Sequence, residues 1–162
     1  MFDKFGEFDS WEELNKAAAG QKAEGDIEAL IELAKENGID EEDAKDYADG
    51  FINELATPLS AAVGKIELEK KALGLKEIMA DWADYIIKEC SESESMALNV
   101  RKKGKSLAGA IGAILKASWE IKERVPEEIM SAAGIKETQR VEMGIPGYNT
   151  VTRILREYYQ EG

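Results

Sequence analysis

The side chains of this sequence that could do chemistry are mainly carboxylates, and they gather in one short stretch. Six acidic residues form what we call the acidic ridge: Asp40, Glu41, Glu42, Asp43, Asp46 and Asp49. Clustered carboxylates can bind a divalent cation or present a negative surface to a basic partner. A calcium loop starting at Asp40 needs Asp or Asn at its fifth position and glycine at its sixth, where Ala44 and Lys45 stand. The pattern therefore predicts an electrostatic surface and no metal site.

The remaining composition removes most catalytic chemistry. The chain has no histidine, which excludes a Ser-His-Asp triad, a Cys-His pair and His-ligated zinc. Cys90 is the only cysteine, and we expect it to be a small buried hydrophobic residue. The run Gly104-Lys105-Ser106 is similar to the end of a P-loop, but Asn99 stands where that motif needs its first glycine. We expect no enzymatic activity and no cofactor.

The net charge lies entirely in the first third of the chain. Residues 1–57 hold 17 of the 33 acidic residues and five lysines, a net charge of −12, while acids and bases balance in residues 58–162. Such asymmetry indicates either a solvated acidic face or a surface that mimics an anion for a charged partner.

A basic cluster lies in the neutral part of the chain, at Arg101, Lys102, Lys103 and Lys105. It could bind phosphates, it could complement the dipole at a helix C-terminus, or it could dock on a partner or on the chain's own acidic third. The overall charge of −12 opposes direct nucleic-acid binding, so we treat the cluster as a secondary candidate for partner binding.

Helix signals recur along the whole chain. We predict an all-α fold of roughly seven to nine helices with little or no β-strand, in one domain over residues 1–162. Helix starts are predicted at Ser10 (with Glu13 completing a capping box), Asp26, Asp40, Thr57-Pro58, Leu75, Ser93, Ser106, Pro126 and Asn149. A break in the helix is expected between Gly20 and Gly25. Polar and apolar residues alternate weakly over Thr138–Met143, which indicates an extended segment.

The helix that begins at Asp40 would carry the acidic ridge. Acids in its first turn complement the helix dipole, which accounts for part of the cluster. Asp43, Asp46 and Asp49 are spaced by three and would lie along one outward side. The packing side is predicted to hold Ala44, Tyr47, Ala48, Phe51, Ile52 and Leu55.

Hydropathy gives an expectation for location. No apolar run approaches the roughly 18–20 residues needed to span a membrane, and the N-terminus lacks the apolar core of a signal peptide. We expect a cytoplasmic protein without membrane contact. The sequence leaves homo-oligomerisation open.

Several segments resemble the PcfK-like family, small proteins of conjugative plasmids and other mobile elements. The segments that carry the resemblance are Phe5–Phe8, Glu12–Ala18, Leu30–Asp40, Glu54–Leu59, Arg101–Leu107, Ala132–Ile135 and Gly144–Gly147. The similarity extends over nearly the whole chain. One branch of that family is classed as anti-CRISPR. The resemblance implies a protein that binds Cas9, or the Cas9–guide RNA complex, and inhibits type II CRISPR-Cas systems. It supplies no catalytic motif.

The charge of the acidic ridge is consistent with binding to Cas9. Cas9 holds nucleic acid in positively charged channels, and carboxylates three residues apart on a helix rise about 4.5 Å, so the ridge could approximate a row of phosphates. The alternative is an accessory protein of plasmid transfer that binds a relaxase, a coupling protein or DNA, in which the basic cluster would matter more.

Overall fold

The computed structural model describes residues 4–136 and 139–160. Within them the chain forms nine α-helices and two short strands, so the predicted all-α fold with little β-structure is confirmed. In chain order the elements are α1 (Trp11–Glu24), α2 (Ile27–Glu36), α3 (Glu41–Asp49), α4 (Pro58–Leu73), α5 (Glu77–Glu92), α6 (Glu94–Arg101), α7 (Leu107–Glu120), β1 (Glu123–Arg124), α8 (Glu127–Ala132), β2 (Glu142–Met143) and α9 (Tyr148–Gln160).

The helix starts follow the local signals closely. Six predicted N-caps accept a backbone N–H with the side chain: Ser10, Asp26, Asp40, Thr57, Ser93 and Ser106. Two details near the first helix differ from the prediction. The Glu13 carboxylate accepts from the Asp9 N–H, one residue before the cap, and α1 continues through Gly20 to end at Gly25. Gly25 has a φ of 73°, which is the left-handed conformation that stops a helix at low cost for glycine.

The helices enclose two hydrophobic cores that meet on α4. The first core packs α1, α2 and α3 against Leu55 and Ala61, and the second packs the rest of α4 against α5, α6, α7 and α9. Ala61 belongs to the first core and its neighbour Ala62 to the second. The start of α4 coincides with the end of the acidic part of the sequence.

A backbone contact fixes the first core to α4. Gly38, with a φ of 70°, ends α2, and a Cβ atom on it would lie 2.4 Å from the Gly64 carbonyl oxygen. Because neither residue has a side chain there, the turn after α2 rests directly on the α4 backbone. Ile39 then packs into the first core, and its N–H donates to the Ala34 carbonyl, as in a Schellman ending.

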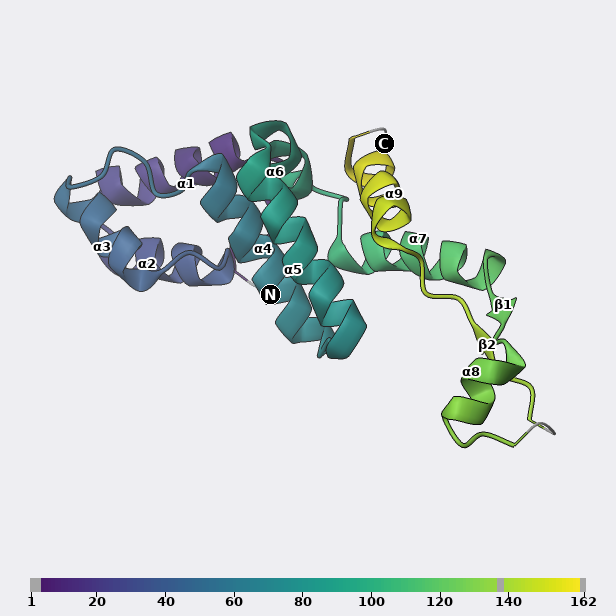
Figure 1. Cartoon of the computed structure of the whole chain (residues 1–162). Helices are drawn as coiled ribbons and strands as arrows, with labels where there is room; N and C mark the ends of the chain where they lie inside the picture. The colour runs from purple at the N-terminus through teal and green to yellow at the C-terminus, as the bar shows by residue number, and fades with distance from the viewer. Residues whose placement is uncertain (1–3, 137–138, 161–162) are drawn as a thin grey trace.

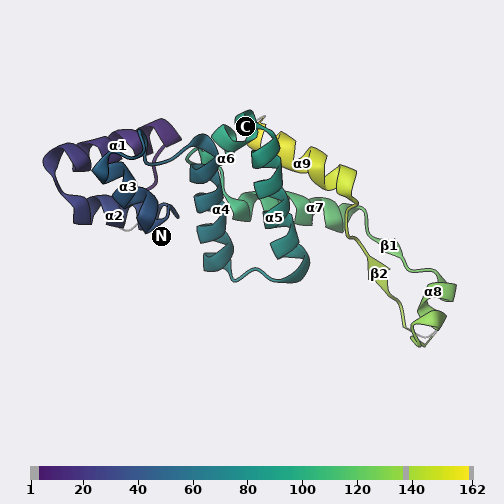
Figure 2. The same cartoon turned by 60° about the vertical axis from the view of Figure 1, so that its left-hand side comes forward.

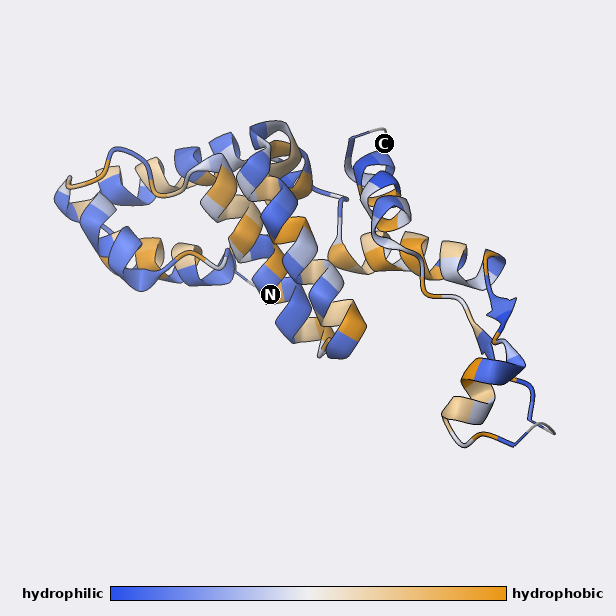
Figure 3. Ribbon diagram, viewed as in Figure 1, coloured by the Kyte–Doolittle hydropathy of each residue, from blue (hydrophilic) through white to orange (hydrophobic). Residues whose placement is uncertain are grey.

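The helical groups lie in a row. Figures 1 and 2 show α1–α3 at one end, α4–α6 in the middle, α7 and α9 beyond them, and α8 at the far end. The hydropathy colouring of Figure 3 shows apolar positions alternating with polar ones along the helices of each group.

The far end is an arm that the sequence did not predict as such. Strands β1 and β2 pair antiparallel, with Glu123 opposite Met143, and carry α8 at their tip. The extended conformation expected over Thr138–Met143 is present at β2, whereas Thr138 lies outside the described residues.

One expected core face is incomplete. The wide apolar face predicted for the helix after Leu75 buries Ile86 and packs Trp82 and Tyr85 partly, but Ile78 and Met79 in its first turn are exposed. The reason is that α7 does not cover the N-terminal turn of α5, where an open apolar groove lies instead.

Candidate functional site

Helix α3 displays the acidic ridge because its other side is anchored. Ala44 and Tyr47 are buried in the first core. The Lys22 ammonium donates to the Tyr47 carbonyl and lies 4.4 Å from the centre of the Tyr47 ring. Gly50 ends the helix with a φ of 83°. The acidic side of α3 therefore points into solvent at the end of the molecule opposite α8 (Figure 1).

Four members of the acidic ridge are fully displayed. Glu42, Asp43, Asp46 and Asp49 are exposed, and none of them forms an ion pair with any residue the structure describes. Glu42, Asp46 and Asp49 stand at i, i+4 and i+7, so they form one stripe along the helix. Four exposed acidic side chains without an ion-pair partner among the described residues thus lie within little more than two helical turns.

The other two members have structural roles. Asp40 caps α3, and its Oδ1 accepts from the Glu42 N–H at 3.0 Å. Glu41 is bound by the Lys35 ammonium at 2.7 Å and the Lys45 ammonium at 2.8 Å. The hydrogen bonds from Lys35 and then Lys45 lower the pKa of Glu41 to about 2. The part of the ridge that could meet a partner is thus narrower than the sequence indicated.

Phe51 was expected to pack beneath the ridge, and this expectation is wrong. Its side chain is 79% exposed, while Ile52 is half-buried and Leu55 is buried. The helix ends at Asp49, so the periodic pattern that assigned Phe51 to the packing side stops before it. An aromatic ring therefore stands in solvent directly after the acidic stripe. Sequence reasoning could have found it by taking Gly50 as a helix stop.

The basic cluster is only partly at the surface, and Arg101 is buried. Arg101 is 1% exposed, and its Nη2 donates to Asn37 Oδ1 at 2.9 Å while Nη1 donates to the Phe8 carbonyl at 3.3 Å. This corrects the prediction of Arg101 as a surface contact. Its partners lie 93 and 64 residues away in sequence, so only the tertiary fold reveals its role.

The three lysines of the cluster divide between the fold and the surface. Lys105 donates to the Tyr158 carbonyl at 2.6 Å and is half-buried. Lys103 lies 3.6 Å from Asp9, and Lys102 bonds Asn99 at 2.7 Å, and both are exposed. Two of the four residues, Arg101 and Lys103, therefore contact the N-terminal part of the chain, which is the internal docking considered among the sequence alternatives.

A buried ion pair that the sequence did not reveal lies at the same junction. The Lys65 ammonium, 1% exposed, donates to Glu7 Oε1 at 2.8 Å and to the Lys102 carbonyl at 2.9 Å. Nearby, Glu69 on α4 accepts from the Leu107 N–H at the start of α7. Burial raises the pKa of Glu69, and the positive charges of Lys65 and Arg101 partly oppose that rise. These groups join the segment before α1 to α4, α6 and α7.

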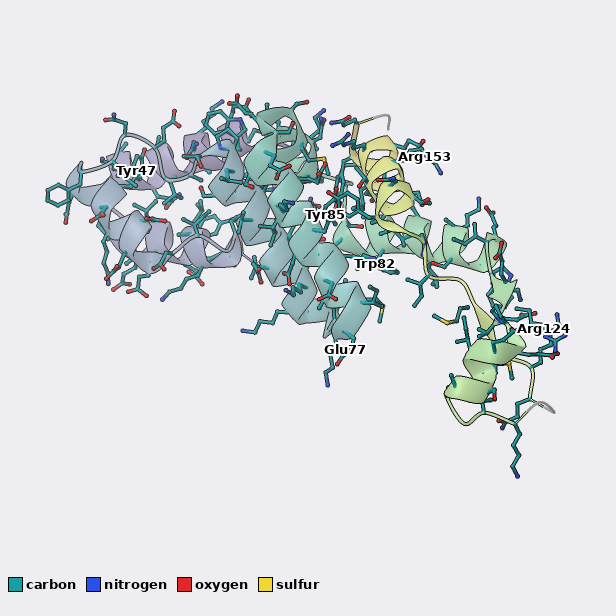
Figure 4. All side chains as sticks on the ribbon, viewed as in Figure 1. Tyr47, Glu77, Trp82, Tyr85, Arg124 and Arg153 are labelled. Carbon is teal, nitrogen blue, oxygen red and sulfur yellow. The ribbon has the colours of Figure 1, made fainter. Side chains whose placement is uncertain are left out.

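A second polar network lies between α5 and α9, where Figure 4 labels Tyr85 and Arg153. It lines a hollow of about 480 Å³. Glu89 Oε2 accepts from Arg156 Nε at 3.1 Å and Nη2 at 3.0 Å, and the Tyr85 hydroxyl donates to Glu89 Oε1 at 2.8 Å. Burial raises the pKa of Tyr85, which keeps this phenol protonated. Because these groups are already hydrogen-bonded to one another, we interpret the network as a structural connection between α5 and α9.

The remaining candidate for covalent chemistry is inert. Cys90 lies in the second core and is 3% exposed. Burial raises the pKa of its thiol to about 12, so the thiolate needed for nucleophilic attack is scarce at neutral pH. No group of three or more acidic or thiol side chains within residues 4–136 and 139–160 is arranged to hold a metal ion. No helix among the described residues has the length and apolarity to span a membrane.

Comparison with known proteins returns no relative: the chain matches no protein-family model, no curated protein and no solved structure. The resemblance to the PcfK-like family stays a prediction.

Proposed function

We propose that this chain inhibits Cas9 of type II CRISPR-Cas systems by binding it, with the acidic ridge on α3 as the contact surface. The single observation that supports this most is the display of Glu42, Asp43, Asp46 and Asp49 without ion-pair partners among the described residues. The choice of partner rests on the resemblance, and the choice of surface rests on the geometry.

The physical argument is charge complementarity with a nucleic-acid channel. Cas9 binds its guide and target through basic surfaces that contact backbone phosphates. An exposed acidic stripe can occupy such a surface, because none of the described residues forms an ion pair with its carboxylates. Binding of this kind weakens as salt is added, since charges separated by more than about 8 Å are screened at physiological ionic strength.

The alternative role in plasmid transfer receives less support from the geometry. It depended on the basic cluster, of which Arg101 is buried and Lys105 is committed to the Tyr158 carbonyl. A gel shift with plasmid DNA at moderate salt separates the two roles. Tight, salt-sensitive DNA binding would favour transfer over Cas9 inhibition.

The decisive experiment titrates the protein into DNA cleavage reactions of Cas9 loaded with guide RNA. Adding the protein before guide loading, after guide loading and after target binding identifies the blocked step. The test variant carries Asp43→Lys, Asp46→Lys and Asp49→Lys. With about 1 kcal/mol for each reversed charge, we expect binding to weaken roughly 100-fold.

A matched control changes charge by the same amount elsewhere. Glu67, Asp81 and Glu120 are exposed acids outside the first core. Their reversal to lysine leaves the ridge intact, so inhibition should persist. If the ridge variant keeps its helical circular dichroism and still inhibits as well as the control, the ridge is not the contact.

A further inference from the structure

The end of the molecule opposite the acidic ridge carries an apolar groove. The groove has a volume of about 410 Å³ and lies between the first turns of α5, the last turns of α7 and the chain that leaves β2. It is lined by apolar side chains, among them Ile78, Met79, Trp82, Leu115, Trp119 and Ile145. Trp119, one of the two tryptophans among them, is 72% exposed. An exposed tryptophan in an apolar groove is typical of a surface that another molecule covers.

The arm beside this groove lacks support of its own. No helix or other strand among the described elements packs substantially against α8, and its only fully buried residue is Met130. Ile129 on the same helix is 58% exposed. A two-stranded ribbon with one helical turn and a half cannot bury enough apolar surface to be stable alone. Figure 3 shows apolar positions on α8 and on the chain between β2 and α9.

The base of the arm is nevertheless fixed, so the arm has a defined direction. A Cβ atom on Gly144 would lie 2.1 Å from the Ser118 carbonyl oxygen, which means that the returning chain rests on the last turn of α7. Lys122 lies 3.5 Å from Glu142 and 4.1 Å from the centre of the Trp119 ring. These contacts fix the base of the ribbon at the edge of the groove, which Glu142 and Ile145 help to line, and α8 extends from there into solvent (Figure 2).

We propose that the groove is occupied by the α8 arm of a second copy of this chain, in a two-fold symmetric dimer. One chain carries both a protruding apolar arm and an open apolar groove, and in a two-fold arrangement each copy supplies one to the other. The proposal is independent of the function proposed above.

The exposed apolar area fits such a dimer. Eight exposed residues at this end are apolar: Ile78, Met79, Leu115, Trp119, Ile121, Ile129, Met143 and Ile145. Together they expose on the order of 800 Å², about what one partner buries in a standard interface.

The charge distribution favours the same end. The net charge of −12 belongs to residues 1–57, and residues 58–162 are neutral. Association through the arm end keeps the two acidic ends far apart, because α3 and α8 lie at opposite ends of the row of helices (Figure 1). Association through the acidic end would bring like charges together.

The test is sedimentation velocity of the full chain at increasing concentration. We expect a dimer, and we expect Trp119→Asp or Ile129→Asp to weaken self-association at least tenfold. Phe51→Asp is the matched control, because it places the same charge on an exposed aromatic residue at the other end. A monomer up to about 100 µM, a range that would detect even weak dimers, overturns the proposal and leaves the groove for another protein.

A cross-linking experiment identifies the occupant. Leu115→Cys in one preparation and Ile129→Cys in another are mixed and mildly oxidised, while native Cys90 stays buried. We expect a mixed disulfide between the two variants and none when Phe51→Cys replaces Ile129→Cys. A dimer that forms without this disulfide and resists Trp119→Asp uses another surface, and the proposal is then wrong.

Discussion

Replacement of Lys65 by methionine should destabilise the fold far more than the same replacement at Lys70 on the same helix. Lys65 is 1% exposed and holds Glu7 at 2.8 Å, whereas Lys70 is one-fifth exposed and pairs with an exposed Asp84. Methionine keeps most of the volume, so the comparison isolates the charge. Lys65→Met removes the counter-charge of Glu7 and one donor to the Lys102 carbonyl.

The expected magnitude follows from burial. Removing one partner of a buried ion pair costs about 3–5 kcal/mol, and an exposed pair contributes about 0–1 kcal/mol. Since the Glu7 side chain is 28% exposed and can regain some water, we expect about 3 kcal/mol for Lys65→Met. Lys70→Met should cost at most about 1 kcal/mol.

The assay is urea unfolding followed by circular dichroism at the helical minimum. With a slope of about 2 kcal/mol per molar urea, Lys65→Met should lower the midpoint by about 1.5 M. Glu7→Gln combined with Lys65→Met should cost less than the sum of the two single changes. Equal midpoints for the Lys65 and Lys70 variants would refute the assignment of Lys65 as a buried structural cation.

Three further outcomes follow from burial and backbone geometry. Burial raises the pKa of the Cys90 thiol to about 12. Cys90 should therefore react with a thiol reagent at pH 8 at least 100-fold more slowly in the folded chain than in the urea-unfolded chain. Equal reaction rates would contradict its burial. Gly38→Ala should lower the free energy of unfolding by at least about 3 kcal/mol, because the new Cβ would meet the Gly64 backbone. Gly74 has a φ of 61° but open space around it, so Gly74→Ala should lower the free energy of unfolding by about 1 kcal/mol in the same denaturation assay. Burial raises the folded-state pKa of Glu69, so the folded state holds this proton more tightly and its contribution to stability increases as the pH falls from neutral toward 4.5. The free energy of unfolding of the native chain minus that of Glu69→Gln should therefore increase over that range, and a flat difference would contradict the assignment.

The sequence predicted what is decided locally. Ser93 and Ser106 cap helices because a hydroxyl can accept an N–H three residues on, and both residues lie within one turn of their partner. The exposure of the acidic ridge also follows from helical spacing around Ala44 and Tyr47.

The sequence failed where distant segments decide. Arginine is usually a surface residue, and nothing in the sequence indicated that Arg101 is buried. Its burial depends on hydrogen bonds to Asn37 and Phe8, which only the tertiary fold brings near. The arm escaped prediction because two-residue strands carry almost no periodic signal. Phe51 was wrongly predicted to be buried because the helical spacing of apolar residues was extended beyond Gly50, where α3 ends.

The position of α4 between the two cores has a consequence for how the molecule unfolds. Ala61 and Ala62 are adjacent, yet they serve different cores, so neither core can dissolve without exposing one side of the same helix. Loss of either side removes the burial that stabilises α4, and the helix is too short to persist alone in water. The helices that form the two cores should therefore unfold as one cooperative unit, and we expect the amides of α4 to exchange with solvent most slowly.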